Sequence, residues 1–236
     1  MDLNAWMEEY RATVEAAFGS RVVCLGLQGS QARGEATPES DIDAVLVLDR
    51  LTPADLARYR EAVCGLPCRE KLCGFVGGKE ELLGWEPGDL FALYSDTAPV
   101  VGDLEFLRPL AGPDAARCCV RNGACAIYHA CVHDLLHERS PQLLAGLQKA
   151  AFFALRAAWY CRTGRIVKQR RELAPLLPPA QRTLLEGDPT DLDGLGGRLL
   201  EWAGRTIRTG EGLDPGAAGA DIKRTLGKGK RARGAG

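Results

Sequence analysis

The sequence predicts an α+β protein, in which a small sheet with flanking helices precedes a helical bundle. Two short apolar runs, 22–27 and 44–48, lie on either side of a turn-rich polar segment and have the length of strands. Beyond Pro109 and Pro113 the pattern changes to long helical stretches with wide apolar faces. We therefore expect a first domain, a helical domain and a disordered basic tail at residues 1–112, 113–208 and 209–236.

The first domain alternates between apolar runs that suit strands and amphipathic runs that suit helices. We expect strands at 21–27, 42–48, 67–76 and 97–101. We expect helices at 2–18, 30–34, 53–64 and 88–94. The clearest boundaries are Gly19, which ends the first helix, and Thr52 with Pro53, which supply an N-cap and a first helical residue. The third strand would carry Glu70.

The second domain is predicted to consist of helices. They are expected at 114–139, 142–164, 179–186 and 190–207. Ser140 and Pro141 supply the N-cap and first residue of a helix about 33 Å long, at about 1.5 Å per residue. Its apolar face is wide and needs partner helices, so a bundle is expected.

Charge and composition exclude several classes of protein. The chain has 236 residues and a formal net charge of −1, which argues against a general nucleic-acid surface. It lacks an apolar run long enough to span a membrane and a basic-then-apolar leader, so we expect a cytoplasmic protein without a membrane partner. Nine cysteines in such a chain are expected to be reduced thiols. Cys64, Cys68 and Cys73 lack paired zinc-site spacing and are expected to be buried.

The segment between the first two strands combines a small-residue turn with two carboxylates. Asp41 and Asp43 are two residues apart, so in a strand both side chains lie on one face, roughly 7 Å apart. Carboxylates beside an apolar run need a compensating charge, and a set of oxygen ligands suits Mg²⁺. Gly29 allows a sharp turn, and Ser30 can cap a helix whose first N–H groups face a phosphate. The segment therefore predicts a phosphate cradle beside a metal site.

The motif Gly29-Ser30-x-Ala32-Arg33-Gly34, followed by Ser40-Asp41-Ile42-Asp43, closely resembles the signature of the DNA polymerase β-like nucleotidyltransferase superfamily. The nearest relatives look like the small bacterial branch that includes aminoglycoside and minimal nucleotidyltransferases. The resemblance implies a small mixed sheet with flanking helices. It also implies that the two aspartates bind Mg²⁺ and that the glycine and first serine hold a triphosphate. Arg33 and Ser40 belong to the same nucleotide-binding motif, where the arginine is expected to shape the loop. Gln28 departs from the pattern, because a large aromatic often stands there.

In this superfamily a hydroxyl attacks the α-phosphorus of a nucleoside triphosphate and pyrophosphate leaves, with two Mg²⁺ ions assisting. A third carboxylate on a neighbouring strand usually completes a metal site or takes the proton. Glu70 is our candidate, as a catalytic residue and a metal ligand, because it follows Asp43 by one helix and starts the next strand. Asp89 and Asp96 are the alternatives.

Further candidates lie in the helical domain. Relatives often place lysines of this region over the phosphates, so Lys149 and Lys168 are expected to bind the nucleotide, although a lysine whose stem packs on apolar neighbours is an alternative. His129, His133 and His137 share one helix; adjacent pairs could chelate a metal or line an acceptor pocket, but packed or hydrogen-bonded roles are favoured. The spacing of arginines and histidines does not fit the ribonuclease motif of related helical domains.

The expected function is Mg²⁺-dependent transfer of a nucleoside monophosphate, AMP from ATP or another triphosphate, to a hydroxyl of a small aminoglycoside-like acceptor. The first alternative is AMPylation of a partner protein, as some antitoxins perform it. A third is a non-catalytic nucleotide-binding or interaction protein, against which the intact Ser-Asp-Ile-Asp motif argues. The sequence leaves open the acceptor, the preferred base, the third carboxylate and the oligomeric state.

Overall fold

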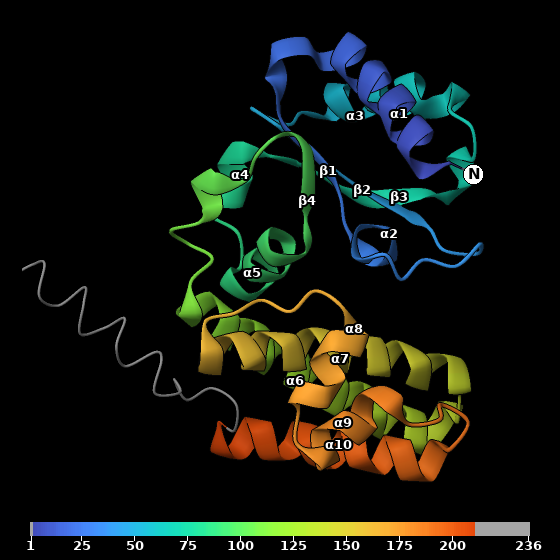
Figure 1. Ribbon diagram of the computed structural model, residues 1–236, viewed down its shortest axis with the longest axis vertical. Helices are drawn as coiled ribbons and strands as arrows, with labels where there is room; N and C mark the ends of the chain where they lie inside the picture. Colours follow the sequence, from blue (N-terminus) through green and yellow to red (C-terminus); the bar gives the residue numbers. More distant parts are fainter. Residues whose placement is uncertain (1, 211–236) are drawn as a thin grey trace, which may run out of the picture. The chain divides into compact units, whose positions relative to one another are not determined.

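The computed structural model describes residues 2–210, which form two compact units (Figure 1). The first unit contains the chain up to Glu86 together with Leu93–Leu110. Among the described residues, the second contains Pro87–Ala92 and residues 111–210. The chain therefore enters the second unit briefly before it completes the first. The predicted domain boundary, a single point between residues 112 and 113, does not include this excursion. The predicted basic tail lies, beyond residue 210, outside the described residues.

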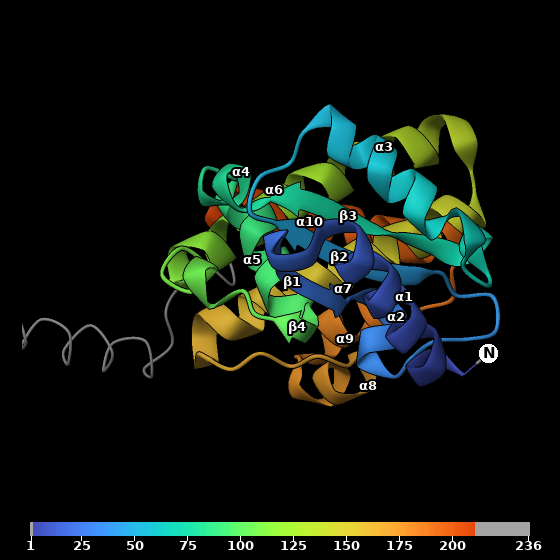
Figure 2. The same ribbon diagram turned by 90° about the horizontal axis from the view of Figure 1, so that it is seen from above.

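A four-stranded mixed sheet forms the centre of the first unit, as predicted. Its strands are β1 Val22–Leu27, β2 Ile42–Leu48, β3 Leu72–Gly78 and β4 Ala98–Gly102. They lie side by side in the order β3-β2-β1-β4 (Figure 2). Strand β1 is antiparallel to both β2 and β4, whereas β2 and β3 are parallel. The two inner strands are therefore β1 and β2, the strands on either side of the motif.

Two helices, α1 Leu3–Phe18 and α3 Pro53–Ala62, lie on the same side of this sheet (Figure 1). The even-numbered residues of β2 pack into the core beneath α1, where Trp6 and Tyr10 are also buried. Because side chains alternate along a strand, the odd-numbered residues of β2 point to the other face. Asp43 is one of them, so its carboxylate faces away from that core.

The third strand begins later than predicted. Cys68 takes a positive φ of 52°, and Arg69–Lys71 form a single 3₁₀ turn before the strand starts at Leu72. Pro67 just before it has no N–H for a ladder, and its carbonyl accepts a hydrogen bond of 2.7 Å from the Trp6 indole. Glu70 is therefore an exposed residue of this turn and not a strand residue, which corrects the prediction.

The remaining short helices of the chain's first half are α2 Gly29–Arg33, α4 Lys79–Leu83 and α5 Pro87–Asp96. The expectation that the clustered cysteines are buried was wrong, because Cys64 and Cys73 are exposed and Cys68 is half-buried. All nine cysteines are free thiols, as expected.

The second unit is helical, with a bundle core, as predicted. Its helices are α6 Pro113–His133, α7 Pro141–Thr163, α8 Arg170–Leu173, α9 Pro179–Glu186 and α10 Leu192–Thr209. Helix α6 packs against both α7 and α10, and Ile127, Leu155 and Leu199 are fully buried between them. A π-helical turn, Asp134–Glu138, continues α6. No helix within residues 2–210 combines the length and the apolar content that a membrane span requires.

A second apolar cluster explains why the segment 87–92 belongs to this unit. The ring of Phe91 packs among alanines of α6 and α7 and lies 5.0 Å from the ring of Tyr160. A Cβ atom on Gly88 would come within 2.6 Å of the backbone nitrogen of Cys119, so the two backbones approach closely. The first half of α5 is therefore anchored in the helical unit.

Candidate functional site

The turn that begins α2 is built around Gly29, which has a φ of +68°. A Cβ atom there would lie 1.8 Å from Oδ2 of Asp43, so any side chain would collide with that carboxylate. The Gln28 N–H donates a 2.8 Å hydrogen bond to the Asp43 carbonyl and continues the pairing of β1 with β2. Glycine is thus required at residue 29 for its backbone conformation and for space, and the Asp43 carboxylate lies directly against it.

The two motif aspartates have open oxygens. Asp41 is exposed just before β2, and Asp43 is half-buried within it. Neither side chain has a hydrogen-bond partner among residues 2–210. Within that part of the chain no group of three or more His, Cys, Asp or Glu side chains converges as a metal site. Two carboxylates still fit Mg²⁺, which proteins commonly hold through one or two carboxylates, waters and substrate phosphates.

The neighbouring strand does not bring Glu70 beside Asp43. The residue paired with Asp43 on β3 is Cys73, and Glu70 lies three residues earlier in the 3₁₀ turn. The prediction that Glu70 lies within the adjacent strand was wrong, because the residue lies in the turn that leads into that strand. A role for Glu70 in the chemistry stays a prediction.

The alternative carboxylates lie in different surroundings. Asp89 is an exposed residue in the first half of α5. Asp96, at the other end of that helix, is only 6% exposed and accepts a hydrogen bond of 3.1 Å from the Gly29 N–H. The sequence alone suggested Asp96 as a candidate but not its contact with Gly29, because the two residues are 67 positions apart in the chain.

Arg33 and Gln28 both face this end of α5. Nη1 of Arg33 donates to the two oxygens of Asp96 at 3.2 and 2.9 Å, and its Nε donates to Glu35 at 3.0 Å. The Gln28 amide donates to the carbonyl of Leu93 at 3.1 Å and to the Thr97 hydroxyl at 3.0 Å. The arginine thus helps to hold the loop, and the Gln28 side chain has two specific partners near the end of α5.

The two motif serines differ in their contacts. Ser30 is half-buried, and its hydroxyl has no hydrogen-bond partner within residues 2–210. Oγ of Ser40 accepts a 2.9 Å hydrogen bond from the Thr37 N–H. Ser40 and Thr37 also line a cavity of about 580 Å³, together with Gln31 and Lys71. The loop therefore borders space that a ligand could occupy.

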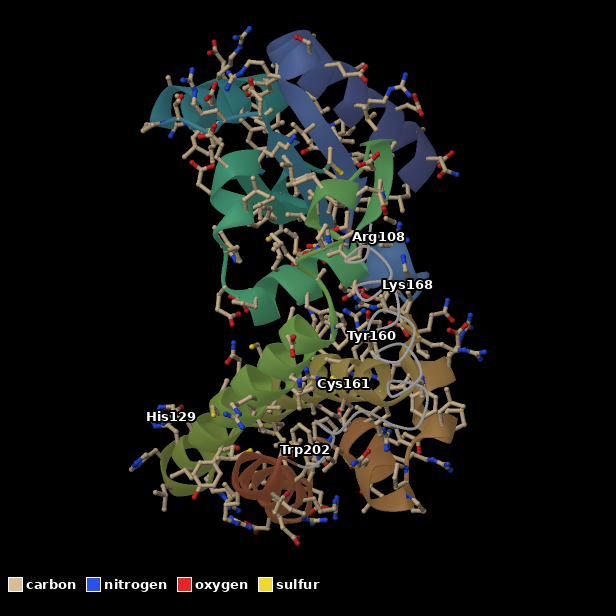
Figure 3. The ribbon with its side chains drawn as sticks, turned by 90° about the vertical axis from the view of Figure 1, so that its left-hand side faces the viewer. Arg108, His129, Tyr160, Cys161, Lys168 and Trp202 are labelled. Carbon is tan, nitrogen blue, oxygen red and sulfur yellow. The ribbon has the colours of Figure 1, made fainter. Side chains whose placement is uncertain are left out.

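The predicted lysines of the second unit are both solvent-accessible. Lys149 is exposed on α7, while its neighbour Gln148 turns inward and donates to the Gly187 carbonyl at 2.8 Å. Lys168 is exposed in the segment that follows α7 (Figure 3). Whether either lysine binds phosphate stays a prediction.

Helix α7 also carries a buried cation that the sequence pattern did not indicate. Arg156 is 2% exposed, and its guanidinium lies 5.6 Å and 5.0 Å from the ring centres of Phe152 and Phe153. Arg170 lies 5.9 Å from the same Phe152 ring. An arginine in the middle of the apolar run from Ala150 to Ala158 is the signal that could have identified it.

Within residues 2–210, the three histidines belong to no group of three or more metal-ligating side chains. All three are exposed, and Figure 3 shows His129 projecting outward from α6. Nε2 of His133 lies 3.3 Å from a carboxylate oxygen of Glu138, and the rings of His133 and His137 are 5.1 Å apart. A hydrogen-bonded role thus fits His133, whereas a packed role fits none of them.

Comparisons with known proteins give one family match, and most of the matched residues belong to the first unit. Residues 7–91 match the family model of a nucleotidyltransferase domain, a range that includes the Gly29 turn and both motif aspartates. One matching solved structure is a spectinomycin adenyltransferase from Enterococcus faecialis with ATP and spectinomycin. It is 12% identical, the match covers 83% of this chain and 98% of that chain, and the TM-score is 0.49. A comparison with curated proteins found no match.

Proposed function

We propose, from the premise that residues 7–91 form a nucleotidyltransferase domain, that this enzyme transfers AMP from ATP to a hydroxyl of a small aminoglycoside-like acceptor. Nucleotidyl transfer rests on the family match. The finer proposal is supported chiefly by one observation. The Asp43 carboxylate lies against Gly29, and neither it nor the hydroxyl of the next residue, Ser30, has a hydrogen-bond partner within residues 2–210. The choice of donor and acceptor follows the resemblance of the motif to the aminoglycoside branch.

Asp41 and Asp43 would hold Mg²⁺, since their oxygens suit it. The bound ion would lower the pKa of the attacking hydroxyl and offset the charge of the phosphates. In the transfer, the hydroxyl oxygen bonds to the α-phosphorus while the bond from that phosphorus to the bridging oxygen breaks. Pyrophosphate then leaves with the electron pair of the broken bond.

The chain's own groups bind and orient the triphosphate. The Ser30 hydroxyl is available as a donor to a phosphate oxygen, and Gly29 keeps the backbone free of a side chain at this point. Such donors stabilise charge that grows on the phosphates as the bond breaks. Glu70 is our candidate to receive the proton of the attacking hydroxyl, because its exposed carboxylate lies in the turn that leads into β3.

The experiment incubates the full chain with Mg²⁺, triphosphates labelled at the α-phosphate and a panel of aminoglycosides and aminocyclitols. We expect a labelled adduct and equimolar pyrophosphate with ATP. Asp43→Asn keeps the shape but removes a charge, so transfer should fall at least ~100-fold, because metal stabilisation supplies several kcal/mol of the barrier reduction.

Circular dichroism should show that the Asp43→Asn protein keeps its fold. Near-normal turnover by this variant would refute the catalytic role of the carboxylate pair. Label on protein and on none of the small acceptors would refute the small-molecule acceptor and favour AMPylation of a partner.

A further inference from the structure

The C-terminal end of α5 holds the motif turn through a set of hydrogen bonds. Asp96 accepts from the Gly29 N–H, and the Gln28 side chain reaches the Leu93 carbonyl and the Thr97 hydroxyl. These contacts join residues that are 65 to 69 positions apart in the sequence. The turn is therefore fixed from outside its own loop.

The ion pair of Arg33 with Asp96 is the most enclosed part of this set. Their side chains are 5% and 7% exposed. Oδ2 of Asp96 accepts from both the Gly29 N–H and the guanidinium, and Oδ1 accepts from the guanidinium at 3.2 Å. A carboxylate held in this way has a fixed orientation, because a charge-assisted contact and a backbone donor constrain the same oxygen.

The position of Gly29 also affects Asp43, the candidate metal ligand. Gly29 lies in contact with the Asp43 carboxylate, where a Cβ atom would come within 1.8 Å of Oδ2. The Gly29 N–H is already used by Asp96, so at this turn the Ser30 hydroxyl remains as a donor for phosphate. A shift of Gly29 would move both the serine and the space around Asp43.

We propose that Asp96 is a positioning residue for nucleotidyl transfer: oriented by Arg33, its carboxylate fixes Gly29 against Asp43 and so presents Ser30 and Asp43 to the triphosphate. This inference rests on the proposed function. It assigns Asp96 a role other than that of the third metal ligand, because its oxygens face the arginine and a backbone N–H.

The test compares the full chain with the variants Asp96→Asn, Asp96→Ala and Arg33→Lys. Asparagine can still accept from the Gly29 N–H, whereas alanine cannot. Lysine keeps the positive charge of Arg33 but lacks the planar guanidinium with its several N–H donors. Asp55→Asn serves as the control, since Asp55 also pairs with an arginine, Arg21, at 2.6 Å but has no contact with the Gly29 turn.

The first measurement is amide hydrogen exchange in the peptide covering residues 27–34, without nucleotide. The second is binding of ATP at several Mg²⁺ concentrations. In Asp96→Ala, exchange in this peptide and the Kd for ATP should both rise about tenfold or more, as expected for loss of a hydrogen bond to a charged group. For Asp96→Asn and Arg33→Lys, the exchange rate and the Kd for ATP should lie between those of wild type and Asp96→Ala. The Mg²⁺ concentration needed for ATP binding should not change. Asp55→Asn should lower the Tm and change neither measurement.

Several outcomes would overturn the inference. Unchanged exchange and ATP affinity in Asp96→Ala would show that the carboxylate does not hold the turn. Recovery of ATP binding by this variant at high Mg²⁺, with Asp96→Asn equally impaired, would identify Asp96 as a metal ligand. If Asp96→Ala does not fold, Asp96→Asn and Arg33→Lys decide the question by the same measurements. A wild-type chain that binds no ATP would refute the proposed function, while the exchange arm would still decide whether Asp96 holds Gly29.

Discussion

Alanine substitutions at two glycines with positive φ can distinguish the effect of backbone strain from that of a steric clash. Gly19 and Gly29 have φ values of 53° and 68°. A Cβ atom on Gly19 would meet nothing within 4 Å, whereas one on Gly29 would meet the Asp43 carboxylate at 1.8 Å. Gly19→Ala should therefore cost only the strain of about 1–3 kcal/mol in the free energy of unfolding and leave ATP binding unchanged.

Gly29→Ala should also carry backbone strain, because the φ of this residue is positive, and in addition it should displace the turn from Asp43. We expect its ATP affinity to fall at least about tenfold, measured by titration beside Gly19→Ala, because both the phosphate donor and the carboxylate move. Normal ATP affinity in Gly29→Ala would mean that the turn does not contact the nucleotide.

The exposed lysines of the second unit make the phosphate prediction testable. If the charge of Lys149 meets phosphate, Lys149→Ala should weaken triphosphate binding by roughly 1.5–3 kcal/mol and leave acceptor binding unaltered. Arg121→Ala provides a control, since Arg121 is likewise an exposed cation on a helix of this unit. Unaltered KM and turnover in Lys149→Ala would exclude the contact, and Lys168→Ala would then be measured in the same way.

At the scale of a single element, the start of α3 shows how a local signal becomes a pH-dependent contact. Thr52 and Asp55 form a reciprocal capping box, and Arg21 donates to Asp55 at 2.6 and 3.1 Å. The hydrogen bonds from Arg21 and Thr52 hold the pKa of Asp55 well below its ordinary value of 3.8. The ionised form is therefore favoured in the folded protein.

A depressed pKa in the folded state implies stability that is fully present above the unfolded value near 3.8 and is lost as the pH falls through the lower folded value. Asp55→Asn should accordingly be less stable than wild type at pH 7, and the difference should shrink below pH 3.8 as the wild-type carboxyl protonates. Urea unfolding between pH 7 and about pH 2 measures this difference. Parallel stability curves would show that the contact does not act through the charge of Asp55.

At the scale of the whole molecule, the division of α5 predicts which fragment can fold by itself. Phe91 is 2% exposed and packs with Ala116, Val120 and Ala157 of the helical unit. A fragment of residues 87–210 should therefore unfold at a higher temperature than one of residues 111–210. Phe91→Ala in the longer fragment should cost about 3–5 kcal/mol, the usual range for removing a buried phenylalanine.

Thermal unfolding followed by circular dichroism compares the three proteins. Leu110→Ala in the full chain is a suitable control for the loss of apolar surface, because Leu110 is 42% exposed and should cost little. Equal melting temperatures for the two fragments would show that the segment 87–92 contributes nothing to the helical unit.

Features governed by short-range physics could be predicted from the sequence. The strand that carries Asp43 and the capped starts of α3 and α7 follow from residues close together in the chain. The same holds for the two-part architecture, since periodicity and proline positions report on local conformation. The sharp turn at Gly29 was also predicted, but Ser30 is the second residue of α2 and not its N-cap, which is Gln28. Through its resemblance to the nucleotidyltransferase signature, the motif also predicted the type of domain whose family model matches residues 7–91.

Only the tertiary structure decided which distant residues meet. Parallel register places Cys73 beside Asp43 and leaves Glu70 in a turn, because Pro67 and Cys68 prevent an earlier start of the strand. Folding also brings Asp96 to Gly29 and Arg33, across more than 60 positions of the chain. Such contacts depend on sheet register and helix packing. Many residues together determine both, so no single position in the sequence indicates them.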